Sequence, residues 1–155
     1  MSRTGNWRAG LVTLRTTSRL PSSTWKRSWH SPVAQAAWIY EKLWAWTDNQ
    51  GAPEDVFSLD TMLDNIMLYW LSEAGASAAR MYWESFRDLP FVPVKVPSGI
   101  SIFPVEAHNA SKRWCEGRFR NLVHYNVLPK GGHFAAFEQP ATFVDEVRAA
   151  FRSVR

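Results

Sequence analysis

The chain has 155 residues, the length of one ordinary domain, with 46% apolar and 21% charged residues. This composition is that of a folded protein and excludes a disordered one. Cys115 is the only cysteine, which excludes an intramolecular disulfide and a zinc site built from several cysteines. No apolar run approaches the roughly 18 residues that a membrane helix needs, so we expect no transmembrane segment and favour a cytoplasmic location.

The net charge of +4 comes from the start of the chain. Residues 1–30 contain six basic side chains, no acidic one and ten Ser or Thr, whereas the remaining residues carry a charge of −2. Such a segment is typical of an organellar transit peptide, of an arm that binds phosphate, or of a stretch outside any fold, disordered or non-native. We favour the last interpretation and expect no nucleic-acid partner.

Residues 31–90 are predicted to be helical. Ser31 and Pro32 suit the start of a first helix, in which apolar residues at three- and four-residue spacing continue to about Trp46. Residues 48–53 form a turn cluster.

A second helix is expected after Ser58, and Tyr69 on this helix is expected to be a buried core residue. Gly75 is expected to break the helical pattern, and Ser77 is expected to cap a third helix over residues 77–86. The predicted buried side of the second helix comprises Leu59, Leu63, Ile66, Met67, Trp70 and Leu71.

Beyond the prolines at 90, 93 and 97, the pattern changes to strand–helix–strand. Residues 100–103 and 122–128 read as strands, with a helix over 112–118 between them and a last helix over about 140–151. This spacing predicts a parallel unit with a right-handed crossover, and hence an α/β fold over residues 91–155.

A carboxylate and a histidine follow the two strands. Glu106 lies just past the first strand and His133 just past the second, so parallel pairing should bring them to the same edge of the sheet. A carboxylate bonded to one imidazole nitrogen fixes the tautomer and makes the other nitrogen more basic. A solvated acid and a loop histidine are the alternative, but Gly131 and Gly132 favour a site because they permit close backbone approach.

The other candidate residues lack such a setting. His124 is expected to be structural within its strand, His108 is the main competitor for a loop role, and His30 has no comparable surroundings. Four dispersed histidines make no metal motif, and we expect no cofactor. Cys115 lies in a short charged helix and is not expected to be a nucleophile.

Residues 131–140, GGHFAAFEQP, resemble the catalytic-histidine segment of α/β-hydrolase-fold epoxide hydrolases of the microsomal type. Residues 31–42, 58–70 and 79–84 resemble further segments of that family in the same order. The resemblance spans about residues 31–153. It implies the C-terminal portion of an α/β-hydrolase fold, with a helical lid at 31–90 and an incomplete sheet carrying the last two parallel strands.

The resemblance also implies a reaction. Epoxide hydrolases convert epoxides to vicinal diols through a covalent alkyl-enzyme ester, a chemistry used in detoxification and xenobiotic metabolism. By position, His133 resembles the base that activates water, Glu106 the acid that orients it, and Tyr82 a lid tyrosine that donates a proton to the epoxide oxygen. A packed core aromatic is the alternative for Tyr82. The implied partners are a small apolar epoxide and water.

The family's nucleophilic aspartate, in a Gly-Gly-Asp-Trp-Gly-like context, has no counterpart here, and neither has its His-Gly-x-Pro oxyanion motif. We therefore expect a fragment that is inactive alone and that self-associates through an exposed sheet edge. A non-catalytic remnant or interaction protein is the alternative. A serine esterase using Ser77 is a minor one, because residues 75–79 only approximate a nucleophile elbow.

Overall fold

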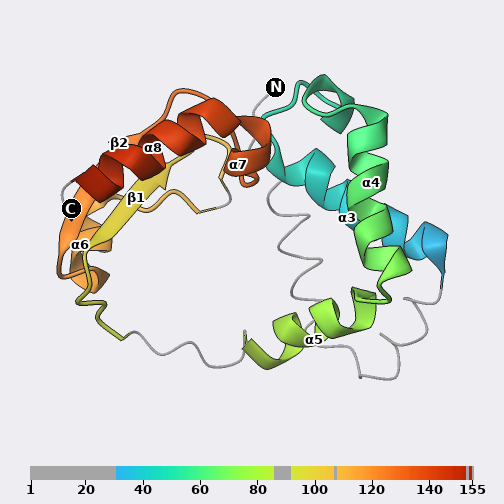
Figure 1. The fold of residues 1–155 in the computed structure, drawn as a ribbon, viewed down its shortest axis with the longest axis horizontal. Helices are drawn as coiled ribbons and strands as arrows, with labels where there is room; N and C mark the ends of the chain where they lie inside the picture. Colours follow the sequence, from blue (N-terminus) through green and yellow to red (C-terminus); the bar gives the residue numbers. More distant parts are fainter. Residues whose placement is uncertain (1–30, 86–91, 107, 153, 155) are drawn as a thin grey trace. The chain divides into compact units, whose positions relative to one another are not determined.

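The computed structural model describes residues 31–85, 92–106, 108–152 and 154 (Figure 1). The predicted basic segment 1–30, with His30, lies outside the described residues, and so does Pro90 in the predicted connection. Among the helices that the structure describes, none combines the length and the hydropathy needed to cross a membrane.

The described residues divide into two compact units. One takes in residues 31–45 and 49–85, and the other takes in residues 46–48 together with the described residues from 92 onward. The short stretch Trp46–Asp48 therefore belongs with a part of the chain that follows it by more than forty residues.

The first unit is helical, as predicted. It contains α3 (Pro32–Trp46), which ends one residue beyond the unit, a 3-10 turn η2 (Pro53–Asp55), α4 (Leu59–Leu71) and α5 (Gly75–Ser85). Ser58 caps α4 as expected, because its side chain accepts a hydrogen bond of 3.1 Å from the Thr61 N–H.

The predicted buried side of α4 is largely wrong. Met62 and Ile66 are the buried residues of this helix, one turn apart. Apolar residues occur almost all round α4, so their spacing alone did not single out one face. The exposed apolar side chains of α4 are those of Leu59, Leu63, Met67, Leu68, Tyr69 and Leu71, so the core assignment of Tyr69 is also wrong.

The third helix begins two residues earlier than predicted, at Gly75. Ser77 is consequently an exposed residue within α5 and not its cap, and its hydroxyl donates to the Ala74 carbonyl at 2.9 Å. A nucleophile elbow needs a strand before the serine, whereas α4 and a short turn precede α5 here. The geometry contradicts the serine-esterase alternative.

The second unit contains the predicted parallel pair. Strand β1 (Ser98–Ile102) and strand β2 (Leu122–Val127) are joined by α6 (Lys112–Arg118) and pair with Ile100 opposite Tyr125 and Ile102 opposite Val127. The register shifts between Ser98 and Gly99. Cys115, on α6, is buried.

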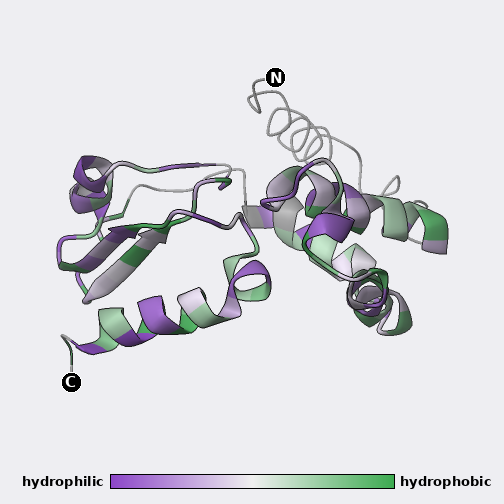
Figure 2. Cartoon of the chain, turned by 90° about the horizontal axis from the view of Figure 1, so that it is seen from above, coloured by the Kyte–Doolittle hydropathy of each residue, from purple (hydrophilic) through white to green (hydrophobic). Residues whose placement is uncertain are grey.

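Two helices follow β2: α7 (Ala135–Glu138), which was not predicted, and α8 (Pro140–Arg152). Helix α8 lies along the sheet (Figure 1) and approaches β1 closely, since a Cβ added at Gly99 would come within 2.7 Å of the Ala150 Cβ. Apolar and polar residues alternate around α8 (Figure 2), as expected for a helix that covers a sheet with one face.

Candidate active site

The parallel pairing continues past the ends of β1 and β2 to the loops that carry Glu106 and His133. The Leu128 N–H donates to the Ile102 carbonyl at 2.8 Å, and the Val105 N–H donates to the Gly131 carbonyl at 3.1 Å. Val105 and Gly132 form an isolated parallel bridge, each one residue before the two candidate side chains. Glu106 and His133 therefore leave neighbouring positions at one edge of the sheet.

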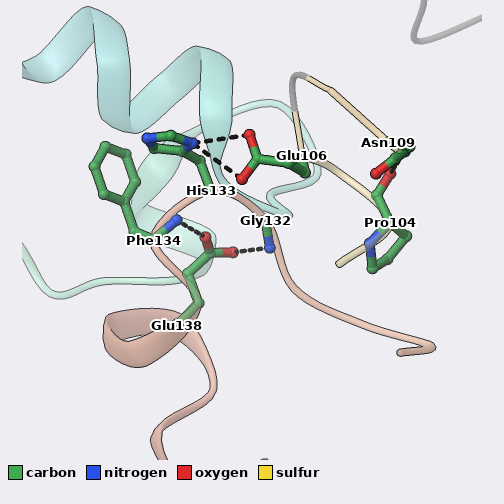
Figure 3. Close-up of polar contacts among 7 residues, drawn as sticks. All are labelled: Pro104, Glu106, Asn109, Gly132, His133, Phe134 and Glu138. Carbon is green, nitrogen blue, oxygen red and sulfur yellow. Dashed lines mark hydrogen bonds and ion pairs between the residues drawn. The ribbon is translucent and has the colours of Figure 1, made fainter. Parts of the chain in front are cut away.

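The two side chains meet directly (Figure 3). The Nδ1 atom of His133 lies 2.8 Å from Oε1 and 3.1 Å from Oε2 of Glu106. A carboxylate only accepts hydrogen bonds, so Nδ1 carries the proton and donates it. This leaves Nε2 as the nitrogen with a free lone pair, the atom that can take a proton from a bound molecule.

The charges around His133 favour its protonated form. The hydrogen bond to Glu106 raises the pKa of His133 above its usual value, burial opposes this rise, and the charges of Glu106 and Glu138 add to it. The His133 side chain is 43% exposed and that of Glu106 is 30% exposed, so the pair can be reached from solvent.

Glycine is required at both positions before His133. Gly131 has φ +111°, and an added Cβ would lie 2.8 Å from Cδ1 of Phe103. At Gly132 an added Cβ would lie 2.4 Å from the carbonyl oxygen of Trp46. The loop can therefore pass this close to Phe103 and to the Trp46 carbonyl only without side chains at these two positions.

Aromatic rings flank the imidazole. The Trp46 ring meets the His133 ring edge-on with centroids 5.0 Å apart, and the Phe134 ring does so at 5.1 Å and 87°. Trp46 is buried, and its carbonyl accepts a hydrogen bond of 2.8 Å from the His133 N–H. Ring contacts to the imidazole and a hydrogen bond to the backbone N–H thus both hold His133 in place.

No protein-family model matches the chain, but individual proteins do. A Stigmatella aurantiaca (strain DW4/3-1) protein named "Putative epoxide hydrolase" is 52% identical over 126 residues, which are 81% of this chain and 29% of that protein. Epoxide hydrolase 1 of Sus scrofa is 35% identical over 130 residues, covering 76% of this chain and 29% of that enzyme.

Solved structures agree. The Aspergillus niger epoxide hydrolase is 31% identical with a TM-score of 0.78, over 94% of this chain and 36% of that one. The juvenile hormone epoxide hydrolase of the silkworm Bombyx mori is 28% identical with a TM-score of 0.81, over 90% of this chain and 38% of that one.

The chain is an epoxide hydrolase homologue. It spans about 29% of the length of the curated relatives it matches, and its fold is part of the α/β-hydrolase fold of those enzymes. The predicted family resemblance and fold class are confirmed.

The remaining candidates of this epoxide hydrolase homologue lie elsewhere. Tyr82 is on α5, in the other unit, and its side chain lies outside what the structure describes. His124 has a structural setting, because its Nε2 lies 2.7 Å from Oε2 of Glu146 on α8. His108 is exposed in a loop. In the described part of the chain, no three His, Cys, Asp or Glu side chains gather to hold a metal ion.

Sequence reasoning missed the residues that support the His133 loop, namely Trp46, Asp48 and Glu138. The Glu138 carboxylate accepts hydrogen bonds from the backbone on both sides of His133 (Figure 3). The sequence carried a signal for Glu138, because this acid follows His133 by five residues within the segment GGHFAAFEQP. The structure shows that Glu138 is half-buried. Nothing local pointed to Trp46 and Asp48, which precede the loop by more than eighty residues.

Proposed function

We propose that the chain supplies the water-activating part of an epoxide hydrolase site, with His133 as general base and Glu106 as the residue that orients it. The observation that carries this proposal is the hydrogen bond from Nδ1 of His133 to the Glu106 carboxylate. It leaves Nε2 able to accept a proton, and it stabilises the imidazolium that forms when it does. The likeness to epoxide hydrolases supports the choice of reaction.

The first step needs a carboxylate nucleophile. An aspartate oxygen attacks one epoxide carbon, the carbon–oxygen bond breaks, and a phenol donates its proton to the developing alkoxide, which gives a hydroxyalkyl ester. We propose Tyr82 as one such donor, because a phenol with a pKa near 10 stays protonated at neutral pH. The substrate is a small apolar epoxide.

The second step uses the pair described above. Nε2 of His133 takes a proton from water, and the resulting hydroxide attacks the ester carbonyl. The acyl–oxygen bond breaks and His133 returns its proton to the leaving alkoxide, which gives the diol. The proton of the carboxylic acid formed at the same time passes back to the phenolate of the first step, so that the aspartate and the phenol are both regenerated. Glu106 holds the imidazole in the tautomer that this sequence requires.

We expect the 155-residue polypeptide by itself not to form diol from styrene oxide. Its sequence contains no Gly-Gly-Asp-Trp-Gly-like context for the nucleophile of the first step. The test of the proposed base is therefore a chimera, in which residues 31–155 replace the matching segment of the Stigmatella aurantiaca relative.

The chimera should convert styrene oxide to diol, and His133→Gln should lower the steady-state rate by about 10²- to 10⁴-fold. The ester should then accumulate on the aspartate, where mass spectrometry of the intact protein detects the added mass. His108→Gln, which alters an exposed histidine outside the pair, is the control and should leave the rate unchanged. Unchanged turnover in His133→Gln would refute the proposed base.

The pH profile provides a second test. The base must be neutral, so hydrolysis of the ester should fall as the pH drops through the His133 pKa, which Glu106 raises above the usual 6.5. Glu106→Gln removes the charge and the strong acceptor, and should move the midpoint of this fall to lower pH while reducing the maximal rate.

A further inference from the structure

Glu138 is bonded to three backbone N–H groups that come from two distant stretches of the chain. Its Oε2 accepts from Asp48 at 2.8 Å and from Gly132 at 3.0 Å, and its Oε1 accepts from Phe134 at 3.1 Å. Figure 3 shows the carboxylate between Gly132 and Phe134, pointing into the loop below the imidazole. Both of its oxygens are therefore used, and neither touches the His133 ring.

The neighbouring contacts complete a continuous attachment of the loop. The Gly131 N–H donates to Oδ2 of Asp48 at 3.1 Å, and the His133 N–H donates to the Trp46 carbonyl at 2.8 Å. Together with the two bonds to Glu138, four consecutive backbone amides, those of residues 131–134, are each hydrogen-bonded to the Trp46–Asp48 segment or to Glu138.

Glu138 has a particular place among these contacts because it bonds to both sides of His133 and to the supporting segment at once. The backbone torsions of His133 set the direction in which its side chain leaves the loop. Amides fixed at Gly132 and Phe134 restrict those torsions, so the imidazole meets Glu106 without first having to order the loop.

We propose that Glu138 is a positioning residue, which holds the backbone on both sides of His133 so that Nδ1 faces Glu106 and Nε2 stays free to act. The kinetic part of this inference rests on the proposed function of His133. The structural part, the orientation and tautomer of the imidazole, does not.

The negative charge of Glu138 acts on His133 in the same direction as that of Glu106. Burial raises the pKa of Glu138 above its usual range, although its three backbone hydrogen bonds oppose the rise. Its negative charge adds to the effect of Glu106 in favouring protonated His133. Glu106 and Glu138 face the loop together with Asp48, so a test must separate charge from geometry.

Two substitutions make this separation. Glu138→Gln keeps the size but has only one acceptor oxygen, so at least one of the three N–H groups loses its partner. Glu138→Asp keeps the charge but is one methylene shorter, and it cannot reach all three N–H groups from the same backbone position. Geometry is disturbed in both variants, whereas charge is lost only in the first.

The readout is NMR spectroscopy of the full chain. In both variants we expect amide hydrogen exchange at one or more of Asp48, Gly132 and Phe134 to quicken by at least about 10-fold, the factor expected from loss of one hydrogen bond to a charged group. The nitrogen chemical shifts of the His133 ring should move away from those of the Nδ1-protonated tautomer. The pKa of His133 should fall further in Glu138→Gln than in Glu138→Asp.

Glu146→Gln is the matched control. The Glu146 carboxylate also has three hydrogen-bond partners, but these are the side chains of Ser101, His124 and Asn126, none of which bonds to Glu138. This variant should leave the His133 tautomer and titration as in the parent. Circular dichroism of each variant establishes that the comparison is between folded proteins.

If the variants do not fold, a measurement on the unmodified chain tests whether Glu138 positions His133. On acidification through the Glu138 pKa, above 4.5, the amide protons of Asp48, Gly132 and Phe134 should shift together, and the His133 ring should shift with them. Three independent transitions, or a His133 ring that ignores this one, would overturn the inference.

Failure of this inference and failure of the proposed function give different results. If Glu138 is no positioning residue, the His133 ring signals match the parent in both variants, while His133→Gln still stops the chimera. If His133 is no base, the ring signals change as expected while the chimera tolerates His133→Gln. In the case that we expect, Glu138→Asp in the chimera lowers kcat and KM for styrene oxide together and leaves kcat/KM unchanged, because only hydrolysis of the ester is slowed.

Discussion

At the scale of single residues, Gly132 shows how tightly the His133 loop is built. Its backbone passes so close to the end of α3 that an added Cβ would lie 2.4 Å from the Trp46 carbonyl oxygen and 3.1 Å from the Thr47 Cα. Both of these are backbone atoms, which cannot swing away as a flexible side chain would. Packing therefore leaves no room for a side chain at residue 132. The same close passage of the backbone allows the Gly132 N–H to reach Glu138.

Gly132→Ala should therefore destabilise the fold by about 1–3 kcal/mol, the usual cost of forcing extra atoms into a packed region. Urea unfolding of the full chain measures the change. Gly117→Ala is the control, because Gly117 lies on α6 and an added Cβ there has no heavy atom within 4 Å. In a helix this second change should stabilise by up to about 1 kcal/mol. A stable Gly132→Ala variant would show that the loop can move away from α3.

At the scale of elements, a polar cluster joins α8 to both strands. Glu146 of α8 accepts hydrogen bonds from Ser101 of β1 at 2.7 Å and from Asn126 of β2 at 2.8 Å, and it bonds to Nε2 of His124 at 2.7 Å. Its side chain is only 13% exposed. Apolar packing of α8, such as that of Ala150 against Gly99, is not directional, so this cluster specifies where along the sheet the helix lies.

The cluster makes stability depend on pH. Burial alone would raise the pKa of Glu146, but the hydrogen bonds from His124, Ser101 and Asn126 outweigh it and lower that pKa below 4.5. A depressed carboxyl pKa contributes stability above the unfolded value of 4.5, and that stability is lost as the pH falls through the folded value.

Glu146→Ala should cost about 1–3 kcal/mol at pH 7, because it leaves three half-buried partners without their acceptor. The difference from the parent should shrink below pH 4.5, as thermal unfolding at a series of pH values will show. Asp145→Asn, which changes an adjacent carboxylate that is 77% exposed, should have little effect at either pH. A pH-independent loss in Glu146→Ala would assign the effect to packing instead of charge.

At the scale of the whole molecule, much apolar surface remains open in each unit. Leu68 and Leu71 on α4 are 70% and 74% exposed, and Phe151 on α8 is 58% exposed. The described sheet has two strands, so each has an unpaired edge within the described residues. Parallel sheets are normally covered on both faces and flanked by further strands, and uncovered surfaces of this kind promote association.

We therefore expect the purified chain to self-associate at micromolar concentration, with a mass above that of the 17.8 kDa monomer in light scattering after gel filtration. Replacing Leu68 and Leu71 by Lys should shift the chain towards the monomer without lowering its melting temperature. Val33→Lys, at an exposed position on α3, serves as control. A chain that is monomeric throughout would contradict this expectation.

The relation between Glu106 and His133 could be predicted because it follows from local patterns and one topological rule. Two short β-rich runs separated by a helix make a parallel pair, and residues that follow parallel strands lie at one edge. The buried face of α4 could not be predicted in the same way, since its apolar residues surround the helix. Helix α7 was missed because four residues are too few for a periodic signal.

The sequence by itself determined the described helices other than α7, the parallel strands, the kinship with epoxide hydrolases and the place of His133 beside Glu106. Side-chain periodicity and short motifs, together with the rule that a strand–helix–strand unit pairs in parallel, are sufficient for such features. Only the tertiary structure decided what holds the His133 loop, because Trp46 and Asp48 reach it across more than eighty residues of sequence. Contacts of that span depend on how the chain folds back on itself, and no local pattern of residues encodes them.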